Sequence, residues 1–141
     1  MVVLDTDHLN VLERNTSPSS TTLRAHLAQL PPDQVVTTII TYEEQMQGWM
    51  AYLAQSRSVA QQVVAYGRLL QHLDNYRRIP ILEFDEAAAV VFQGLRRSRR
   101  HVGAMDLKIA AIALSRNALL LSKDLADFGQ VPGLQVEDWT S

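Results

Sequence analysis

The sequence contains no cysteine among its 141 residues. Disulfide bonds are therefore impossible and thiolate metal sites are excluded, which favours a cytoplasmic protein. No apolar run approaches the roughly 20 residues that a membrane-spanning helix needs, so we expect no contact with a membrane. The N-terminus carries no basic segment and meets an acid at position 5, and we therefore predict no signal peptide.

The chain also has no strong charge of either sign, since its formal net charge is −2. A strongly basic balance would indicate a large electrostatic contact with nucleic acid, and this sequence has none. A nuclease is still possible, because a carboxylate site adds negative charge that bound cations offset. The composition, with 47% hydrophobic and 20% charged residues, is typical of a globular protein. The length predicts one domain over residues 1–141.

Short apolar runs alternate with segments of helical spacing. The runs predict strands at residues 2–4, 35–40, 79–82, 118–121 and 134–136. Helices are expected from about residue 9, over 19–30, over 42–76 as a hairpin that breaks near 56–58, over 86–99 and over 104–115. This alternation predicts an α/β protein of three layers, α/β/α, with a mostly parallel central sheet of about five strands and a helical hairpin.

Several polar residues are predicted to begin helices. Ser19 or Ser20 is expected to cap the helix that precedes Pro31, and Asp85 the helix that follows the third strand. Thr41 offers an N-cap for the hairpin, and Glu44 follows it at the spacing of a capping box. If these residues cap helices, capping alone explains why they occur at these positions.

Polar residues also follow the predicted strands, at the edge where parallel sheets bind ligands. The first strand is followed by Asp5 and Asp7, the second by Thr41 and Glu44, the fourth by Ser122, Lys123 and Asp124, and the buried helix opens with Asp106. Acids that are far apart in the sequence are therefore expected at one edge of one sheet.

Asp106 and Asp5 are the acids that capping explains least well. An aspartate beside a strand or helix is usually a cap or turn residue, and this interpretation stays open for Asp7, Asp124 and Asp127. Asp106, however, begins a nearly uncharged helix, and Asp5 ends the strand expected at the sheet centre. Burying a carboxylate is costly unless it is paired or bound to a metal.

Adjacent carboxylates cannot all stay ionised without a cation. Oxygen ligands without histidine or cysteine select Mg²⁺ or Mn²⁺ rather than zinc. One or two such ions can support hydrolysis of a phosphodiester without a nucleophilic side chain. The residues thus favour a metal-dependent nuclease.

The same residues resemble the motifs of the PIN-domain nucleases, and within them those of the VapC toxins of toxin–antitoxin systems. The resemblance covers nearly the whole chain: residues 3–7, 40–44 with Gly48, 103–107, and 122–139. It implies catalytic and metal-binding roles for Asp5, Glu44, Asp106 and Asp124, with Thr6, Asp7, Ser122 and Asp127 in support. Whether Asp124 or Asp127 supplies the fourth acid stays open.

The resemblance also implies a PIN-like sheet, magnesium-dependent endonucleolytic cleavage of RNA, a homodimer, and inhibition by a cognate antitoxin.

A basic cluster near the end of the fifth helix has two interpretations. It either suits the negative end of the helix dipole or contacts RNA phosphates. Its members are Arg96, Arg97, Arg99, Arg100 and His101.

Two alternatives compete with the nuclease hypothesis. A phosphatase of the haloacid dehalogenase type would use Asp5 as nucleophile, Asp7 as general acid and Lys123 beside the phosphate. That assignment leaves Glu44 and Asp106 without a role. A non-catalytic, receiver-like module would instead hold one magnesium ion and bind a protein partner. The histidines at positions 8, 26 and 72 show no ligand spacing and are expected to be structural or exposed.

Overall fold

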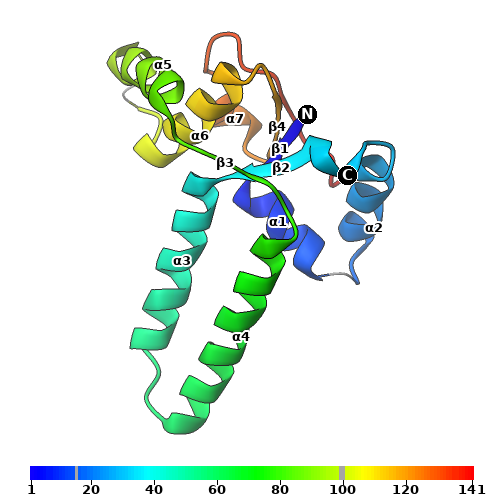
Figure 1. Ribbon diagram of the computed structural model, residues 1–141, viewed down its shortest axis with the longest axis vertical. Helices are drawn as coiled ribbons and strands as arrows, with labels where there is room; N and C mark the ends of the chain where they lie inside the picture. The colour runs from blue at the N-terminus through cyan, green and yellow to red at the C-terminus, as the bar shows by residue number, and fades with distance from the viewer. Residues whose placement is uncertain (15, 99–100) are drawn as a thin grey trace.

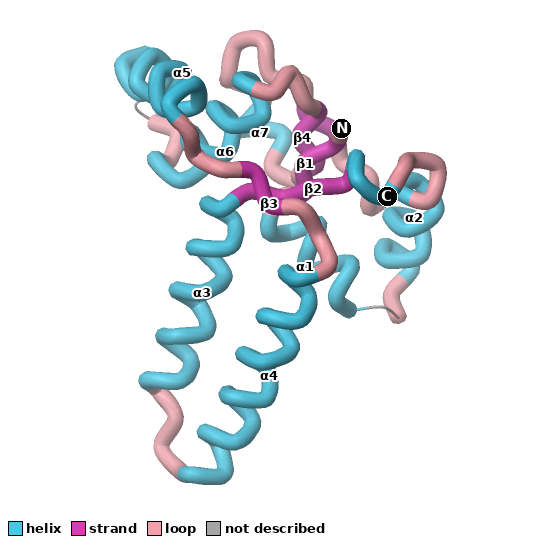
Figure 2. The backbone as a smooth tube through the Cα atoms, viewed as in Figure 1, coloured by secondary structure: helices cyan, strands magenta, loops and turns pink. Residues whose placement is uncertain are grey.

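Five short strands form the central sheet of the computed structural model, which describes residues 1–14, 16–98 and 101–141. Their order is β3-β2-β1-β4-β5, and every neighbouring pair is parallel. The strands are β1 (Val2–Leu4), β2 (Val35–Thr38), β3 (Ile81–Leu82), β4 (Leu119–Leu121) and β5 (Val136–Glu137). β1 occupies the centre, as predicted for the strand that ends at Asp5. Figure 2 shows the strands gathered in the middle of the molecule.

Helices cover both faces of this sheet, which confirms the predicted α/β architecture (Figure 1). They are α1 (Thr6–Arg14), α2 (Pro18–Leu27), the 3-10 helix Pro32–Gln34, α3 (Ile39–Ala54), α4 (Val59–Arg77), α5 (Glu86–Ser98), α6 (Ala104–Ser115) and α7 (Leu125–Phe128). The predicted hairpin is α3 followed by α4, and it breaks between Ala54 and Val59 as expected.

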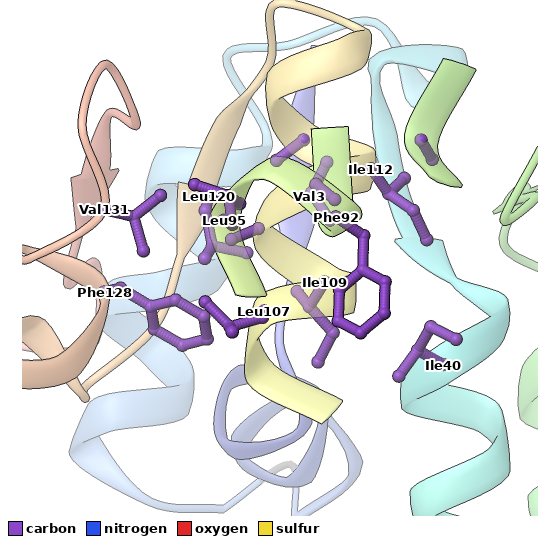
Figure 3. Packing of buried hydrophobic residues seen from close by; sticks show 14 of the residues in the cluster. Val3, Ile40, Phe92, Leu95, Leu107, Ile109, Ile112, Leu120, Phe128 and Val131 are labelled. Carbon is purple, nitrogen blue, oxygen red and sulfur yellow. The ribbon is translucent and has the colours of Figure 1, made fainter. Parts of the chain in front are cut away.

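Alternation along the central strands divides the core in two. Val3 of β1 and Leu120 of β4 pack with α5 and α6, in the cluster that Figure 3 shows. Val2 and Leu4 point to the other face and pack with α1 and α2. Because successive strand residues face opposite sides, three apolar residues in a row serve both clusters. The two hydrophobic clusters therefore hold the centre of the sheet on both of its faces.

Helix α6 is the most deeply buried helix of the described chain. Residues 109–113 are all fully buried, and Leu107 is 1% exposed. The helix packs against both β4 and α5, so its middle has no solvent face that polar residues could occupy. This explains the apolar run over residues 109–114, and it places Asp106 in the first turn of a helix that has little freedom to move.

The α3–α4 hairpin extends away from the sheet (Figure 1). One row of apolar side chains on α4 is exposed although it has the four- and three-residue spacing of a packed helix face. We call this row the α4 stripe, and its members are Val59, Val63, Tyr66, Leu70 and Leu73. Its exposure indicates that α4 has an apolar side that the other described residues do not cover.

Three predicted boundaries are wrong. The second strand ends at Thr38 rather than at residue 40, and Thr38, not Thr41, caps α3 by accepting a hydrogen bond from the Thr41 N–H at 3.1 Å. Glu44 therefore belongs to no capping box. Ser17, not Ser19 or Ser20, caps α2, because Pro18 suits the first helical position.

Smaller differences concern the other element ends. α2 stops at Leu27 rather than at residue 30, the last strand lies at Val136–Glu137, and the short helix α7 was not predicted. Asp85 does cap α5, accepting from the Ala88 N–H at 3.0 Å. Within the described residues, no helix is long and apolar enough to cross a membrane.

Candidate active site

Asp5 lies at the carboxyl end of the central strand and is only 8% exposed. Its Oδ1 accepts a hydrogen bond from the Thr6 N–H at 2.8 Å, and its Oδ2 accepts one from the Ser122 hydroxyl at 2.9 Å. Burial raises the pKa of Asp5 to about 6, and the nearby charges of Asp7 and Asp106 add to the shift. The two hydrogen bonds fix the carboxylate but do not supply a counter-charge.

Glu44 projects from the second turn of α3 towards the same charges. Its Oε1 is buried and has no hydrogen-bond partner within residues 1–14, 16–98 and 101–141. Burial raises the pKa of Glu44 to about 7, and Asp5, Asp106 and Glu43 raise it further in that order. A buried carboxylate oxygen without a donor is costly unless a cation contacts it.

Asp106 lies between two sets of acids. It contributes to the raised pKa values of Asp5 and Glu44 on one side. On the other, its ligand oxygen and those of Asp124 and Asp127 lie within 4.8 Å of one another. Burial, followed by the charges of Asp124 and Asp127, raises the pKa of Asp106 itself.

This donor set fits a hard divalent cation. The candidate ligands are all carboxylate oxygens, which Mg²⁺ and Mn²⁺ prefer, and a cation would contact the Glu44 Oε1, which no described residue bonds. Both Asp124 and Asp127 adjoin Asp106, so the geometry does not choose between them. Asp124 also caps α7, because its Oδ1 accepts from the Asp127 N–H at 3.1 Å.

Both carboxylate oxygens of Asp7 have hydrogen-bond partners, so Asp7 supports the acid cluster and offers no free oxygen to a cation. Its Oδ2 accepts a hydrogen bond from the Lys123 N–H at 2.9 Å and lies 3.2 Å from the Ser122 hydroxyl. Its Oδ1 lies 2.6 Å from His8 Nδ1. Burial alone would raise the pKa of Asp7, but the hydrogen bonds from His8 and from the Lys123 backbone outweigh it and lower the pKa. A group that gives up its proton this readily is poorly suited to be the general acid of the phosphatase alternative.

Ser122 joins these acids across the sheet edge, although it lies 117 residues from Asp5 in the sequence. Besides donating to Asp5, its Oγ accepts from the Asp124 N–H at 3.1 Å. Ser122 therefore contacts both Asp5 and the backbone of Asp124. Thr6 differs, since its Oγ1 is buried without a partner among the described residues. Thr41 pairs instead with Thr38, their hydroxyl oxygens lying 3.1 Å apart.

The basic cluster is only partly described. Arg96 and Arg97 are exposed in the last turn of α5, where a cation suits the helix dipole. The Arg96 guanidinium lies 6.0 Å from the centre of the Phe92 ring. Arg99 and Arg100 fall outside the described residues. Contact between this cluster and RNA stays a prediction.

Fold and site together define a class of protein: a parallel α/β fold with an all-carboxylate site, suited to divalent cations, at the carboxyl ends of its strands. A family model described as the PIN domain matches residues 2–134. The chain belongs to the PIN domain family, and the resemblance inferred from its motifs is confirmed.

Curated relatives and solved structures agree with this assignment. The chain is 30% identical over 115 residues to Ribonuclease VapC1 of Haemophilus influenzae (strain R2866), covering 79% of this chain and 78% of that protein. Over 67 residues it is 37% identical to the tRNA(fMet)-specific endonuclease VapC of Shigella flexneri, covering 45% and 51%.

Two structures illustrate the shared fold. The VapBC-1 structure from nontypeable Haemophilus influenzae matches with a TM-score of 0.72 and 27% identity over 100% of both chains. DNA-bound VapBC from Salmonella typhimurium matches with a TM-score of 0.76 and 24% identity, covering 98% and 97%. The second likeness supports the fold alone.

Proposed function

We propose that the chain is a magnesium-dependent endoribonuclease and the toxin of a VapBC-type toxin–antitoxin pair, with Mn²⁺ able to replace Mg²⁺. The observation that carries the proposal is the buried oxygen of Glu44, which has no partner in the described part of the chain and lies near the charges of Asp5 and Asp106. The relatives, which are named a ribonuclease and a tRNA(fMet)-specific endonuclease, supply the substrate class. We treat residues 1–141 as one cytoplasmic domain.

In this proposal Asp5, Glu44, Asp106 and Asp124 hold the cation, and Asp127 shares or replaces the role of Asp124. A bound divalent ion supplies Lewis acidity for hydrolysis of an RNA phosphodiester by water. Ser122 keeps Asp5 oriented through its 2.9 Å hydrogen bond. Glu44, with a pKa of about 7, gives up its proton as the cation binds, so binding should strengthen as the pH rises to neutrality.

The test is cleavage of a labelled RNA with Mg²⁺ and with EDTA, for the wild type and Asp106→Asn. We expect cleavage only by the wild type with Mg²⁺. Asp33→Asn is the matched control, because Asp33 is exposed in the 3-10 helix and should leave the rate unchanged. A wild-type rate in Asp106→Asn, or cleavage that survives EDTA, would contradict the proposal.

RNA contact is proposed for Arg96, Arg97, Arg99 and Arg100. Arg96 and Arg97 are exposed, and phosphate contacts make binding weaken with salt. Replacing both by glutamine should reduce the salt dependence of RNA binding while leaving Mg²⁺ binding intact. An unchanged salt dependence would remove these residues from the RNA-binding surface.

We also propose that a cognate antitoxin binds the chain and that two copies form a homodimer. The solved VapBC structures are toxin–antitoxin complexes of similar chains, and the α4 stripe offers an apolar surface for the antitoxin. Leu70→Glu should prevent co-purification with the antitoxin encoded beside this chain, while Gln62→Glu, at an exposed site of the same helix, should not. Sedimentation of the isolated chain at its monomer mass of 15.8 kDa would contradict the homodimer.

A further inference from the structure

His8 is a fully buried histidine in the first turn of α1, directly beside the acid cluster. Both of its ring nitrogens have partners. Nδ1 lies 2.6 Å from Asp7 Oδ1, and Nε2 accepts a hydrogen bond from the backbone N–H of Trp139 at 3.1 Å. None of the roles proposed above uses this residue.

The partner at Nε2 determines which nitrogen of His8 carries the hydrogen. A backbone N–H can only donate, so Nε2 must be the accepting nitrogen. The hydrogen then lies on Nδ1, which donates to Asp7. Asp138 does not compete for the ring, because its Oδ1 is 3.6 Å from Nε2 and already accepts from the N–H and hydroxyl of Thr140.

From Asp7 the connection continues to the metal-binding acids. Its second oxygen, Oδ2, is held by the Lys123 N–H and lies beside the Ser122 hydroxyl that also contacts Asp5. Hydrogen bonds therefore connect the C-terminal segment, His8, Asp7 and the Lys123 backbone, and the hydroxyl of the adjoining Ser122 lies between Asp7 and Asp5. Each member fixes the orientation of the next.

We propose that His8 is a positioning residue for the cation site: by donating from Nδ1 to Asp7, it holds Asp7 and Ser122 in the arrangement that orients Asp5. The inference rests on the proposed metal site but does not require that RNA is the substrate. Residues that orient metal ligands typically change metal affinity by about 10- to 100-fold when they are replaced. His8 would act through Asp7 and does not touch the cation.

Two substitutions separate the two hydrogen bonds of the ring. The amide of an asparagine matches Nδ1 in its distance from the backbone, so His8→Asn retains a donor to Asp7 and loses the acceptor for Trp139. The longer glutamine reaches the place of Nε2, so His8→Gln retains the acceptor and loses the donor. Both variants leave space at a fully buried site and should lower stability.

His72→Gln is the matched control, because His72 is a buried histidine of α4 that packs against Tyr42 and Tyr76.

The measurement is the Kd of the purified chain for Mn²⁺ alone, from the free-ion paramagnetic resonance signal at a temperature where each variant is folded. We expect His8→Gln to raise the Kd about tenfold, and His8→Asn and His72→Gln to stay within a factor of about three. An unchanged Kd in His8→Gln would overturn the inference, as would an equal loss in His8→Asn. If a variant at position 8 does not fold, Asp7→Ala removes both acceptor oxygens from the same connection. It should raise the Kd by a similar factor, and a wild-type Kd would overturn the inference.

The same experiment separates this inference from the proposed function. If the wild type binds Mn²⁺ but cleaves no RNA, the ribonuclease proposal fails and the comparison between the position-8 variants still decides the role of His8. If the wild type binds no Mn²⁺, the cation site and the role of His8 are both refuted.

Discussion

Replacing Asp5 by asparagine should stabilise the metal-free protein at pH 8, although Asp5 is one of the most deeply placed acids of the site. The change removes a carboxylate but preserves its bonding pattern. The asparagine Oδ1 can accept from the Thr6 N–H, and its Nδ2 can donate to Ser122 Oγ, which remains free to donate to Asp7. The substitution therefore removes a charge without leaving a buried polar atom unpaired.

The magnitude follows from the pKa of Asp5, which burial raises from 3.8 to about 6. Because the folded-state pKa lies above the unfolded one, the protonated group stabilises the fold below about pH 4, and this stability is lost as the pH rises through about 6. At pH 8 the loss is complete and amounts to about 3 kcal/mol. Since the asparagine amide is itself polar and its burial also costs free energy, we expect the substitution to recover about 2 kcal/mol, or about 6 °C in Tm.

The assay is thermal unfolding followed by circular dichroism in EDTA, from pH 5 to pH 8, for both proteins. The wild-type Tm should fall over this range more steeply than that of Asp5→Asn, so the difference between them should be largest at pH 8. Added Mg²⁺ should raise the wild-type Tm and have little effect on the variant. A variant that is less stable than the wild type at pH 8 in EDTA would refute the electrostatic reasoning.

Three further outcomes test other parts of the structure. Glu44→Gln should remove the part of the pH dependence that comes from a pKa of about 7 and abolish stabilisation by Mg²⁺; a Mg²⁺ shift in Tm equal to that of the wild type would exclude Glu44 as a ligand. Phe128→Ala, at a fully buried site, should lower the free energy of unfolding by about 3–5 kcal/mol in urea titrations, and a loss below about 1 kcal/mol would mean that α7 does not pack as described. Thr38→Ala should lower it by about 1 kcal/mol and Thr38→Ser should restore it, whereas equal losses in both would show that the hydroxyl does not cap α3.

The architecture was predictable because the buried parallel strands and α6 have sequences that consist of apolar runs. Such runs do not mark their own ends, however. Residues 35–40 are uniformly suited to a strand, yet the Thr38 hydroxyl accepts a hydrogen bond from the Thr41 N–H, so the strand ends two residues early and α3 begins three residues early. The helix α7 spans only Leu125–Phe128, which is too short to produce a periodic pattern.

The acids of the site were predictable as a set, since each follows a strand or opens a buried helix. Their individual environments were not. The contact between Ser122 and Asp5 spans 117 residues, and that between Trp139 and His8 spans 131, so neither has a local sequence signal. The one local signal for His8 was its position directly after Asp7, and spacing rules for metal ligands pass over it because it binds an acid rather than an ion.

The rigidity around the acids keeps them buried and close together, so that burial first and mutual repulsion second raise their pKa values. Asp5 directly follows Leu4, which is fully buried, and Asp106 directly precedes Leu107, which is 1% exposed. Moving either carboxylate away would disturb a close-packed core, at a cost comparable to the repulsion itself. The acids can therefore be relieved only by taking up protons or a cation. The metal-free protein should therefore be less stable at neutral and alkaline pH than at mildly acid pH or with its cation bound. At neutral pH the proposed enzyme would thus depend on the cation for stability as well as for chemistry.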